Sequence, residues 1–211
     1  LLKSVLGYVD TEHYTYGELF NEINANTGGI NCGVEVFDRA DSTEEFQAMF
    51  SVRGKALYTK MDFLFKMIGE ILNSSKLEDT KRLYEIVASV KSRAQVNLTG
   101  AGHSTAVLRA AAYSSPMAAF QDEMAGIGYY QFIEKLEKDF EQRKEETVEE
   151  LCKLMKKILR PENFMISYTG ERESLETVQK LAGAVKAGLG TEPVEKSEEK
   201  LTCTKKNEGF K

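Results

Sequence analysis

The sequence predicts an α+β fold with a mainly antiparallel sheet and helices packed on one of its faces. Segments 30–37 and 46–57 alternate apolar and polar residues, as strands with one buried face do. Segment 163–169 shows the same alternation late in the chain. The remaining segments carry apolar residues at helical spacing. Two neighbouring strands, a late strand and helices between them favour this fold class.

The first elements are expected to be two helices. The chain begins with a helix-like stripe of Leu2, Val5, Leu6 and Val9. Thr15 and Glu18 have the spacing of a capping box, in which each side chain binds an amide of the first turn. The helix that follows carries one apolar stripe, formed by Tyr16, Leu19, Phe20 and Ile23. Gly28 and Gly29 should end it, because glycine enters left-handed backbone conformations without steric cost.

After the first strand we expect a polar loop at 38–44, then an antiparallel second strand with Gly54 as a possible bulge. Helical spacing predicts seven further helices at 61–72, 77–98, 104–113, 118–125, 129–141, 147–159 and 174–189. Ser75 with Glu78, and Thr147 with Glu150, have the spacing of two more capping boxes. The glycines of segment 99–102 predict a break or kink.

We expect residues 1–189 to form one domain and residues 190–211 to form a polar linker toward a following domain. The chain starts at Leu1 without a methionine, so we expect it to be a segment of a longer protein.

Composition describes a soluble globular chain. Of its 211 residues, 42% are apolar and 29% are charged, and the net charge is −5. This charge argues against nucleic acid or an anionic membrane as a partner. No apolar run approaches the roughly 20 residues of a membrane-spanning helix. The three widely spaced cysteines, Cys32, Cys152 and Cys203, favour a reducing compartment over disulfides or a zinc knuckle.

Motifs for catalysis are missing from the sequence. Metallopeptidase helices carry two histidines and a glutamate as H-E-x-x-H or H-x-x-E-H, and the residues around His13 fit neither pattern. Segment 100–105, G-A-G-H-S-T, follows a predicted helix and lacks the Gly-Lys-Ser/Thr ending of a phosphate loop. Cys32 lies on the apolar face of a predicted strand, where a structural thiol is expected. We therefore assign no catalytic, cofactor-binding or metal residue.

Three runs of sequence match a known family in their order and spacing. They are Y-G-E-L-F-N-E-I-N-A-N-T-G-G-I at 16–30, R-A-Q-V-N-L-T-G-A-G-H-S-T-A-V-L-R-A-A-A-Y-S-S-P at 93–116 and N-F-M-I-S-Y-T-G at 163–170. Together they resemble the presequence protease branch of the insulinase (pitrilysin) zinc metallopeptidases. The resemblance extends over about residues 1–189.

The resemblance implies a degenerate copy of a peptidase domain. Proteins of that branch have four homologous α+β domains in two halves, which close around a chamber that admits unfolded peptides. The first domain carries the H-x-x-E-H zinc helix, and this chain resembles the third. The offset of the zinc helix from the first strand places its positions near residues 1–5, which hold no histidine or glutamate. The tail 208–211 resembles the junction before the fourth domain, whose arginine and tyrosine would lie beyond this chain.

The function so implied is that of a non-catalytic domain in a zinc metalloendopeptidase that degrades unfolded peptides. The domain would form part of the chamber wall and of the contact between halves, with zinc bound by another domain. Its partners would be peptide substrates and the catalytic half. One alternative is a stand-alone scaffold subunit, like the inactive core-subunit homologues of the mitochondrial processing peptidase. Another is an α+β interaction module that only mimics the pattern. Eukaryotic members of the branch lie in organelles, and we expect a bacterial cytoplasmic parent.

Overall fold

The computed structural model describes residues 1–194, apart from the side chains of residues 39 and 42–44. It confirms the α+β class. The strands are β1 (Ile30–Arg39) and β2 (Ser42–Gly54), which pair in a two-stranded antiparallel sheet. The helices are α1 (Leu2–Val5), α2 (Tyr16–Asn26), α3 (Met61–Ser74), α4 (Thr80–Gly100), α5 (Gly102–Ala112), α6 (Pro116–Ala125), α7 (Ile127–Lys138), α8 (Phe140–Ile158) and α9 (Leu175–Ala187). Short 3-10 turns occur at Tyr58–Lys60, Pro161–Asn163 and Arg172–Ser174.

The described chain divides into two compact units. The first contains residues 1–33, 50–86 and 143–194, and the second contains residues 34–49 and 87–142. The single domain expected over 1–189 stays a prediction, and most of the expected linker lies outside the described residues. None of the described helices is both long enough and apolar enough to cross a membrane.

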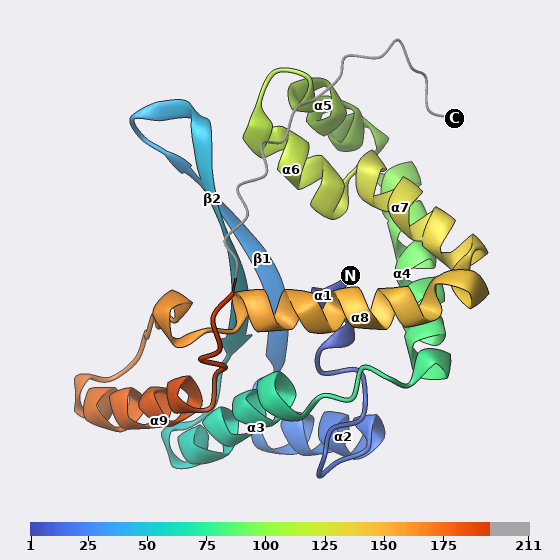
Figure 1. Cartoon of the computed structure of the whole chain (residues 1–211). Coiled ribbons are helices and arrows are strands. Elements are labelled where there is room, and N and C mark those ends of the chain that lie inside the picture. Colours follow the sequence, from blue (N-terminus) through green and yellow to red (C-terminus); the bar gives the residue numbers. More distant parts are fainter. Residues whose placement is uncertain (195–211) are drawn as a thin grey trace. The chain divides into compact units, whose positions relative to one another are not determined.

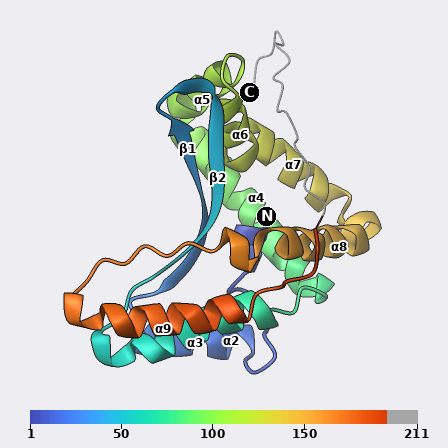
Figure 2. The same ribbon diagram turned by 60° about the vertical axis from the view of Figure 1, so that its left-hand side comes forward.

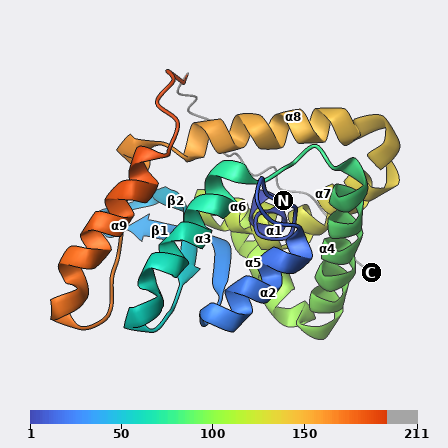
Figure 3. The same ribbon diagram turned by 90° about the horizontal axis from the view of Figure 1, so that it is seen from below.

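A layer of helices forms the core of the first unit. Helix α3 contacts α2 on one side and α9 on the other, as Figure 3 shows. The facing side chains are buried, as expected from their helical spacing. They include Leu19, Ile23, Leu64, Met67, Ile71, Val178, Ala182 and Val185.

Helix α2 begins at the predicted capping box. The Glu18 N–H donates to Thr15 Oγ1 at 3.3 Å, and the Thr15 N–H donates to Glu18 Oε2 at 2.9 Å. The predicted stripe is half right, because Leu19 is buried whereas Phe20 is exposed. The helix ends at Asn26, and Gly29 then takes a φ of +106° before β1 begins. That positive φ favours glycine at the turn.

The hairpin is longer than the sequence predicts (Figure 1). The polar loop expected at 38–44 was wrong, because both strands continue toward the tip and only residues 40–41 remain as a turn. Two-residue turns of this kind join antiparallel strands directly. Strand β2 therefore begins four residues earlier than expected and ends at Gly54.

Helices α5, α6 and α7 pack in succession within the second unit (Figure 1). The predicted break after α4 is confirmed, since α4 ends at Gly100 and α5 begins at Gly102. Ser115 accepts the Ala118 N–H at 3.3 Å, and Pro116 occupies the first position of α6. Phe46 of β2 and Phe120 of α6 have ring centroids 5.3 Å apart, so β2 packs on this helix.

Three local predictions were wrong. Ser75 does not cap α4; its hydroxyl donates to the Ile71 carbonyl, and the cap comes from Asp79. Thr147 lies inside α8 and its hydroxyl donates to the Arg143 carbonyl, because no helix breaker separates Phe140 from this position. Segment 163–169 forms no strand: Asn163 ends a 3-10 turn, and residues 164–169 pair with no other strand among the described residues.

Candidate functional site

The positions predicted to correspond to a zinc helix lie in the core of the first unit. Leu2 and Val5 of α1 are buried, as are Leu6 and Val9 after it. Gly7 reverses the chain with a φ of +85°, and a Cβ there would lie 3.9 Å from Ile71 Cδ1 of α3. Helix α1 is only one turn long, so the helix expected over 1–9 is shorter than predicted. These positions hold apolar packing.

The residues present at these positions do not fit a zinc ion. Zinc takes the imidazole nitrogen of His, the thiolate of Cys or the carboxylate of Asp or Glu, usually three or four from the protein, and segment 1–5 contains none of these residues. Within residues 1–194, no group of three or more His, Cys, Asp or Glu side chains could hold a metal ion. That this segment binds no metal stays a prediction.

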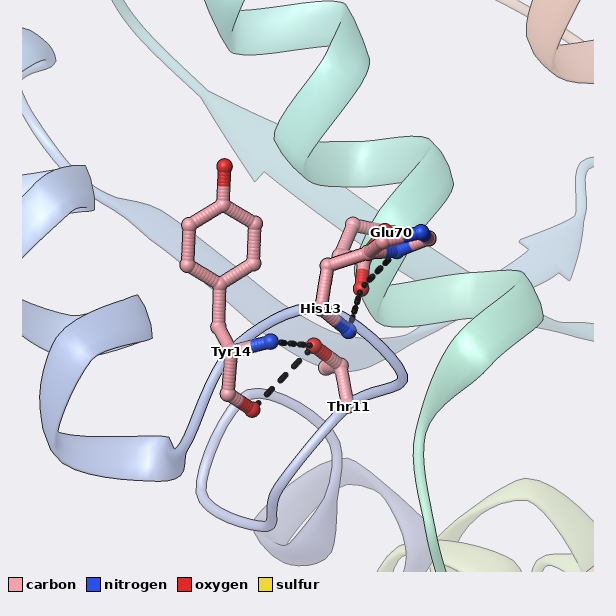
Figure 4. A network of polar contacts seen from close by, with 4 residues as sticks. All are labelled: Thr11, His13, Tyr14 and Glu70. Atoms are coloured by element: carbon pink, nitrogen blue, oxygen red, sulfur yellow. Dashed lines mark hydrogen bonds and ion pairs between the residues drawn. The ribbon is translucent and has the colours of Figure 1, made fainter.

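A buried carboxylate holds the loop that follows α1 (Figure 4). Glu70 of α3 has a side chain only 9% exposed, whereas the His13 side chain is 65% exposed. The His13 N–H donates to Glu70 Oε1 at 3.2 Å, and His13 Nδ1 lies 3.0 Å from Glu70 Oε2. The Tyr14 N–H donates to the buried hydroxyl of Thr11 at 3.2 Å. The loop 11–14 is therefore fixed on α3 by one glutamate.

Burial raises the pKa of Glu70, but hydrogen bonds from the Thr11 hydroxyl and from the backbone and ring of His13 outweigh burial and leave the pKa below its usual value. A carboxylate that accepts several hydrogen bonds is a poor general base. His13 and Glu70 also supply only two of the ligands that zinc needs. We interpret the pair as a clamp on the loop.

Arg82, near the start of α4, contacts the chain on either side of this loop. Arg82 Nε donates to the Tyr8 carbonyl at 2.9 Å, and its guanidinium lies 3.8 Å from the centre of the Tyr16 ring. This cation–π contact holds the exposed Tyr16 ring against α4. The Tyr16 N–H donates to Asp10 Oδ1 at 2.7 Å, so Asp10 supplies a further acceptor at the start of α2.

The described cysteines have the properties of structural thiols. Burial raises the pKa of Cys32 to about 11, and burial together with Glu78 raises the pKa of Cys152. Because the thiolate is the nucleophile, both groups are poorly reactive near neutral pH. Cys203 lies outside the described residues.

Sequence reasoning missed a buried ion pair in the second unit. Asp122 of α6 is 1% exposed, and its Oδ2 lies 2.5 Å from Nη1 of Arg109 on α5. The same carboxylate accepts the N–H groups of Ile127 at 3.0 Å and Gly128 at 3.1 Å, which open α7. Asp122 thus joins three consecutive helices. One sign was available in the sequence, because Arg109 is the only Lys, Arg, Asp or Glu between Arg93 and Asp122.

Neither unit shows a catalytic arrangement among its described residues. The Asp122 carboxylate accepts from Arg109, Ile127 and Gly128. The Glu70 carboxylate is bound by the backbone and ring of His13. The segment at 100–105 forms a helix junction and the start of α5, as predicted. What can be assigned from the geometry is a set of contacts that hold loops and helices together.

Comparison with known proteins gives the family. A family model described as peptidase M-16C associated matches residues 1–136, which is more than half of the chain. The chain belongs to the peptidase M-16C associated family. The resemblance predicted from sequence is thereby confirmed.

Several relatives share the whole chain or most of it. Protein HypA of Clostridium perfringens is 31% identical over 210 residues, which is 100% of this chain and 21% of HypA. The mitochondrial presequence protease of Yarrowia lipolytica is 29% identical over 68% of this chain and 14% of its own length. Presequence protease 1 of Arabidopsis thaliana, named chloroplastic/mitochondrial, is 25% identical over 81% of this chain and 16% of its own length. The chain thus spans about a fifth of HypA and less of the other two.

Proposed function

We propose that this chain is a non-catalytic domain of a zinc metalloendopeptidase that degrades unfolded peptides. The match of the peptidase M-16C associated family to residues 1–136 carries the proposal. The relatives named presequence proteases support the reaction class. The zinc would be bound outside this chain, since residues 1–5 hold no His, Cys, Asp or Glu, and Leu2 and Val5 are buried apolar residues.

The role of this domain would be architectural. It would form part of the wall of a peptide chamber and part of the contact between two halves of the full-length protein. The buried carboxylates support such a role, because Glu70 and Asp122 hold loops and helices in fixed positions. For the compartment we propose a bacterial cytoplasmic parent, and the match of HypA from Clostridium perfringens across the whole chain supports the bacterial source. The relatives named mitochondrial or chloroplastic support an organelle matrix if the parent is eukaryotic.

The test uses the full-length protein with an unstructured peptide as substrate. We expect cleavage that a chelator abolishes and that added zinc restores. Zinc content is measured beside activity for the wild type and for the variants His13→Gln and Glu70→Gln. Both variants should retain the wild-type zinc content, because neither residue is a ligand in this proposal.

Two outcomes would reject the proposal in different ways. Cleavage that resists chelation would reject zinc as the catalytic metal, and no cleavage at all would favour the scaffold alternative. Loss of zinc in His13→Gln would place a ligand inside this domain and end its non-catalytic assignment. Fractionation of the source cells would test the compartment, and a protein found inside an organelle would overturn the cytoplasmic assignment.

A further inference from the structure

The segment between α8 and α9 is extended but unpaired. Residues 164–169 run between the 3-10 turns Pro161–Asn163 and Arg172–Ser174, and Figure 2 shows this stretch as a tube leading into α9. Its sequence, F-M-I-S-Y-T, is rich in the β-branched and aromatic residues that favour strands. The segment therefore has the composition of a strand and a backbone that forms neither helix nor turn.

Within the described residues, only Phe164, the first residue of the segment, makes a backbone–backbone hydrogen bond. The Phe164 N–H donates to the Pro161 carbonyl at 3.4 Å, and residues 165–169 make no backbone–backbone hydrogen bond within the described chain. A strand in this state presents a row of donors and acceptors ready to pair.

Contacts within the first unit fix where the segment ends. The Tyr168 hydroxyl donates to the Glu171 carbonyl at 3.1 Å, and the Glu171 N–H donates to the Tyr58 hydroxyl at 2.8 Å. A Cβ on Gly170 would meet the hydroxyl end of the Tyr168 side chain, so Tyr168 folds back over the turn that follows the segment. The end of the segment is thus held beside the 3-10 turn at Tyr58–Lys60.

Apolar side chains of the segment are exposed. Met165 is 70% exposed and Ile166 is 42% exposed, while Phe164 and Tyr168 are half-buried. Free sheet edges in proteins are protected by charged residues or proline, and 164–169 contains neither. If this segment bound peptides only transiently, its apolar edge would be exposed to solvent whenever no peptide was bound.

We propose that residues 164–169 form a sheet strand whose partner is a strand of the full-length protein outside residues 1–211. This inference rests on the proposed function, in which the chain is one domain of a larger peptidase. It is consistent with the relatives, of which the chain spans about a fifth or less.

Hydrogen exchange of the full-length protein tests the pairing. Peptides that cover 164–169 should exchange as slowly as those from β2, because paired amides open only with the sheet. Exchange at the rate of an unstructured peptide would overturn the proposal. Peptide cleavage and its chelator sensitivity are measured on the same sample. Cleavage tests the proposed function and hydrogen exchange tests the strand pairing, so the failure of one can be told from the failure of the other.

Two proline variants show which edge of the strand is hydrogen-bonded to the partner. Successive N–H groups of a strand point to opposite edges, so Ile166→Pro and Ser167→Pro remove donors from opposite sides. If one edge is paired, one variant should lose protection and the other should keep it; if both edges are paired, both should lose protection. Protection that persists in both variants would contradict a paired strand. Met165→Ala, which keeps all backbone donors, is the control and should retain slow exchange.

A cross-link identifies the partner. A photoreactive phenylalanine analogue replaces Met165 in the full-length protein, and the linked peptide is identified by mass spectrometry. A link to a peptide outside residues 1–211 supports the proposal. A link to residues 195–211, to the substrate peptide or to a second copy of the protein would overturn it.

Discussion

Arg109 and Asp122 are separated by 13 residues in sequence and form an ion pair inside the second unit, with Nη1 2.5 Å from Oδ2. The carboxylate also accepts two backbone N–H groups at the start of α7. The pair therefore ties α5, α6 and α7 together at one point. Breaking one partner of a buried pair is costly because the other charge stays buried without compensation.

Asp122→Ala should destabilise the second unit strongly. It leaves the Arg109 guanidinium and the N–H groups of Ile127 and Gly128 without their acceptor. We expect a loss of about 3–5 kcal/mol in the free energy of opening of α7. Native-state hydrogen exchange on peptides from α6 and α7 measures it.

Glu123→Ala is the matched control for Asp122→Ala. Glu123 is the neighbouring acid, and it is exposed on α6. Its replacement should change the opening free energy by no more than about 0.5 kcal/mol. Equal effects of the two substitutions would contradict the role assigned to the buried carboxylate.

Gly126→Ala should destabilise the same junction for a steric reason. A Cβ at this position would lie 2.3 Å from Asp122 Oδ1 and 2.9 Å from the Asp122 Cα, so backbone as well as side chain would have to move. We expect a loss of about 1–3 kcal/mol in the free energy of unfolding, as overpacking usually costs. Urea unfolding followed by circular dichroism measures it.

Gly69→Ala is the control for Gly126→Ala, and it should change the free energy of unfolding in the opposite direction. Gly69 lies in α3, and a Cβ there would meet nothing within 4 Å. Gly69→Ala should therefore stabilise the chain by about 0.5–1 kcal/mol, since alanine favours helix over glycine. A destabilising Gly69→Ala would show that helix propensity does not decide the outcome here.

Local rules predicted the parts of the fold that depend on neighbours in sequence. The Thr15–Glu18 capping box, the end of α2 before Gly29 and the break between α4 and α5 were all predictable, because each depends on residues within a few positions. The buried face of α4, with Leu83, Val87 and Val90, also followed from helical spacing.

Features that depend on distant residues could not be predicted in this way. The Arg109–Asp122 pair needs α5 and α6 to pack first, and the Glu70 clamp joins residues 57 positions apart. Segment 163–169 has the pattern of a strand, but pairing requires a neighbour that the described chain does not supply. Thr147 has the spacing of a cap, yet helix-favouring residues before it let α8 run through.

The cap of α4 gives a test between the sequence pattern and the structure. The Arg82 N–H donates to Asp79 Oδ1 at 3.0 Å, and Arg82 lies three residues after Asp79. Asp79→Ala should cost about 1 kcal/mol of unfolding free energy, because an orphan amide of the first turn loses its acceptor. Urea unfolding measures the change.

Ser75→Ala is the comparison for Asp79→Ala. Ser75 has the spacing of a capping box with Glu78, but α4 begins five residues later, at Thr80. The substitution removes only a hydroxyl bond to the Ile71 carbonyl at 2.7 Å. Ser75→Ala should lower the free energy of unfolding by less than Asp79→Ala does. A larger loss for Ser75→Ala would support Ser75 as the cap of α4, as the sequence predicted.

The clamp of Glu70 on the loop 11–14 should make stability depend on acid pH. Burial raises the pKa of Glu70, but hydrogen bonds from Thr11 and His13 outweigh burial and leave the pKa below the usual 4.5 in the folded chain. A depressed pKa stabilises the folded state above pH 4.5, and that stability is lost as the pH falls through the folded pKa. Glu70→Gln should be less stable than the wild type at pH 7 and should lose less stability on acidification.

Urea midpoints from about pH 7 to about pH 2 measure the difference between Glu70→Gln and the wild type. Glu12→Gln, at an exposed glutamate of the same loop, is the control and should follow the wild type. Parallel curves for wild type and Glu70→Gln would show that the clamp contributes nothing to the acid dependence.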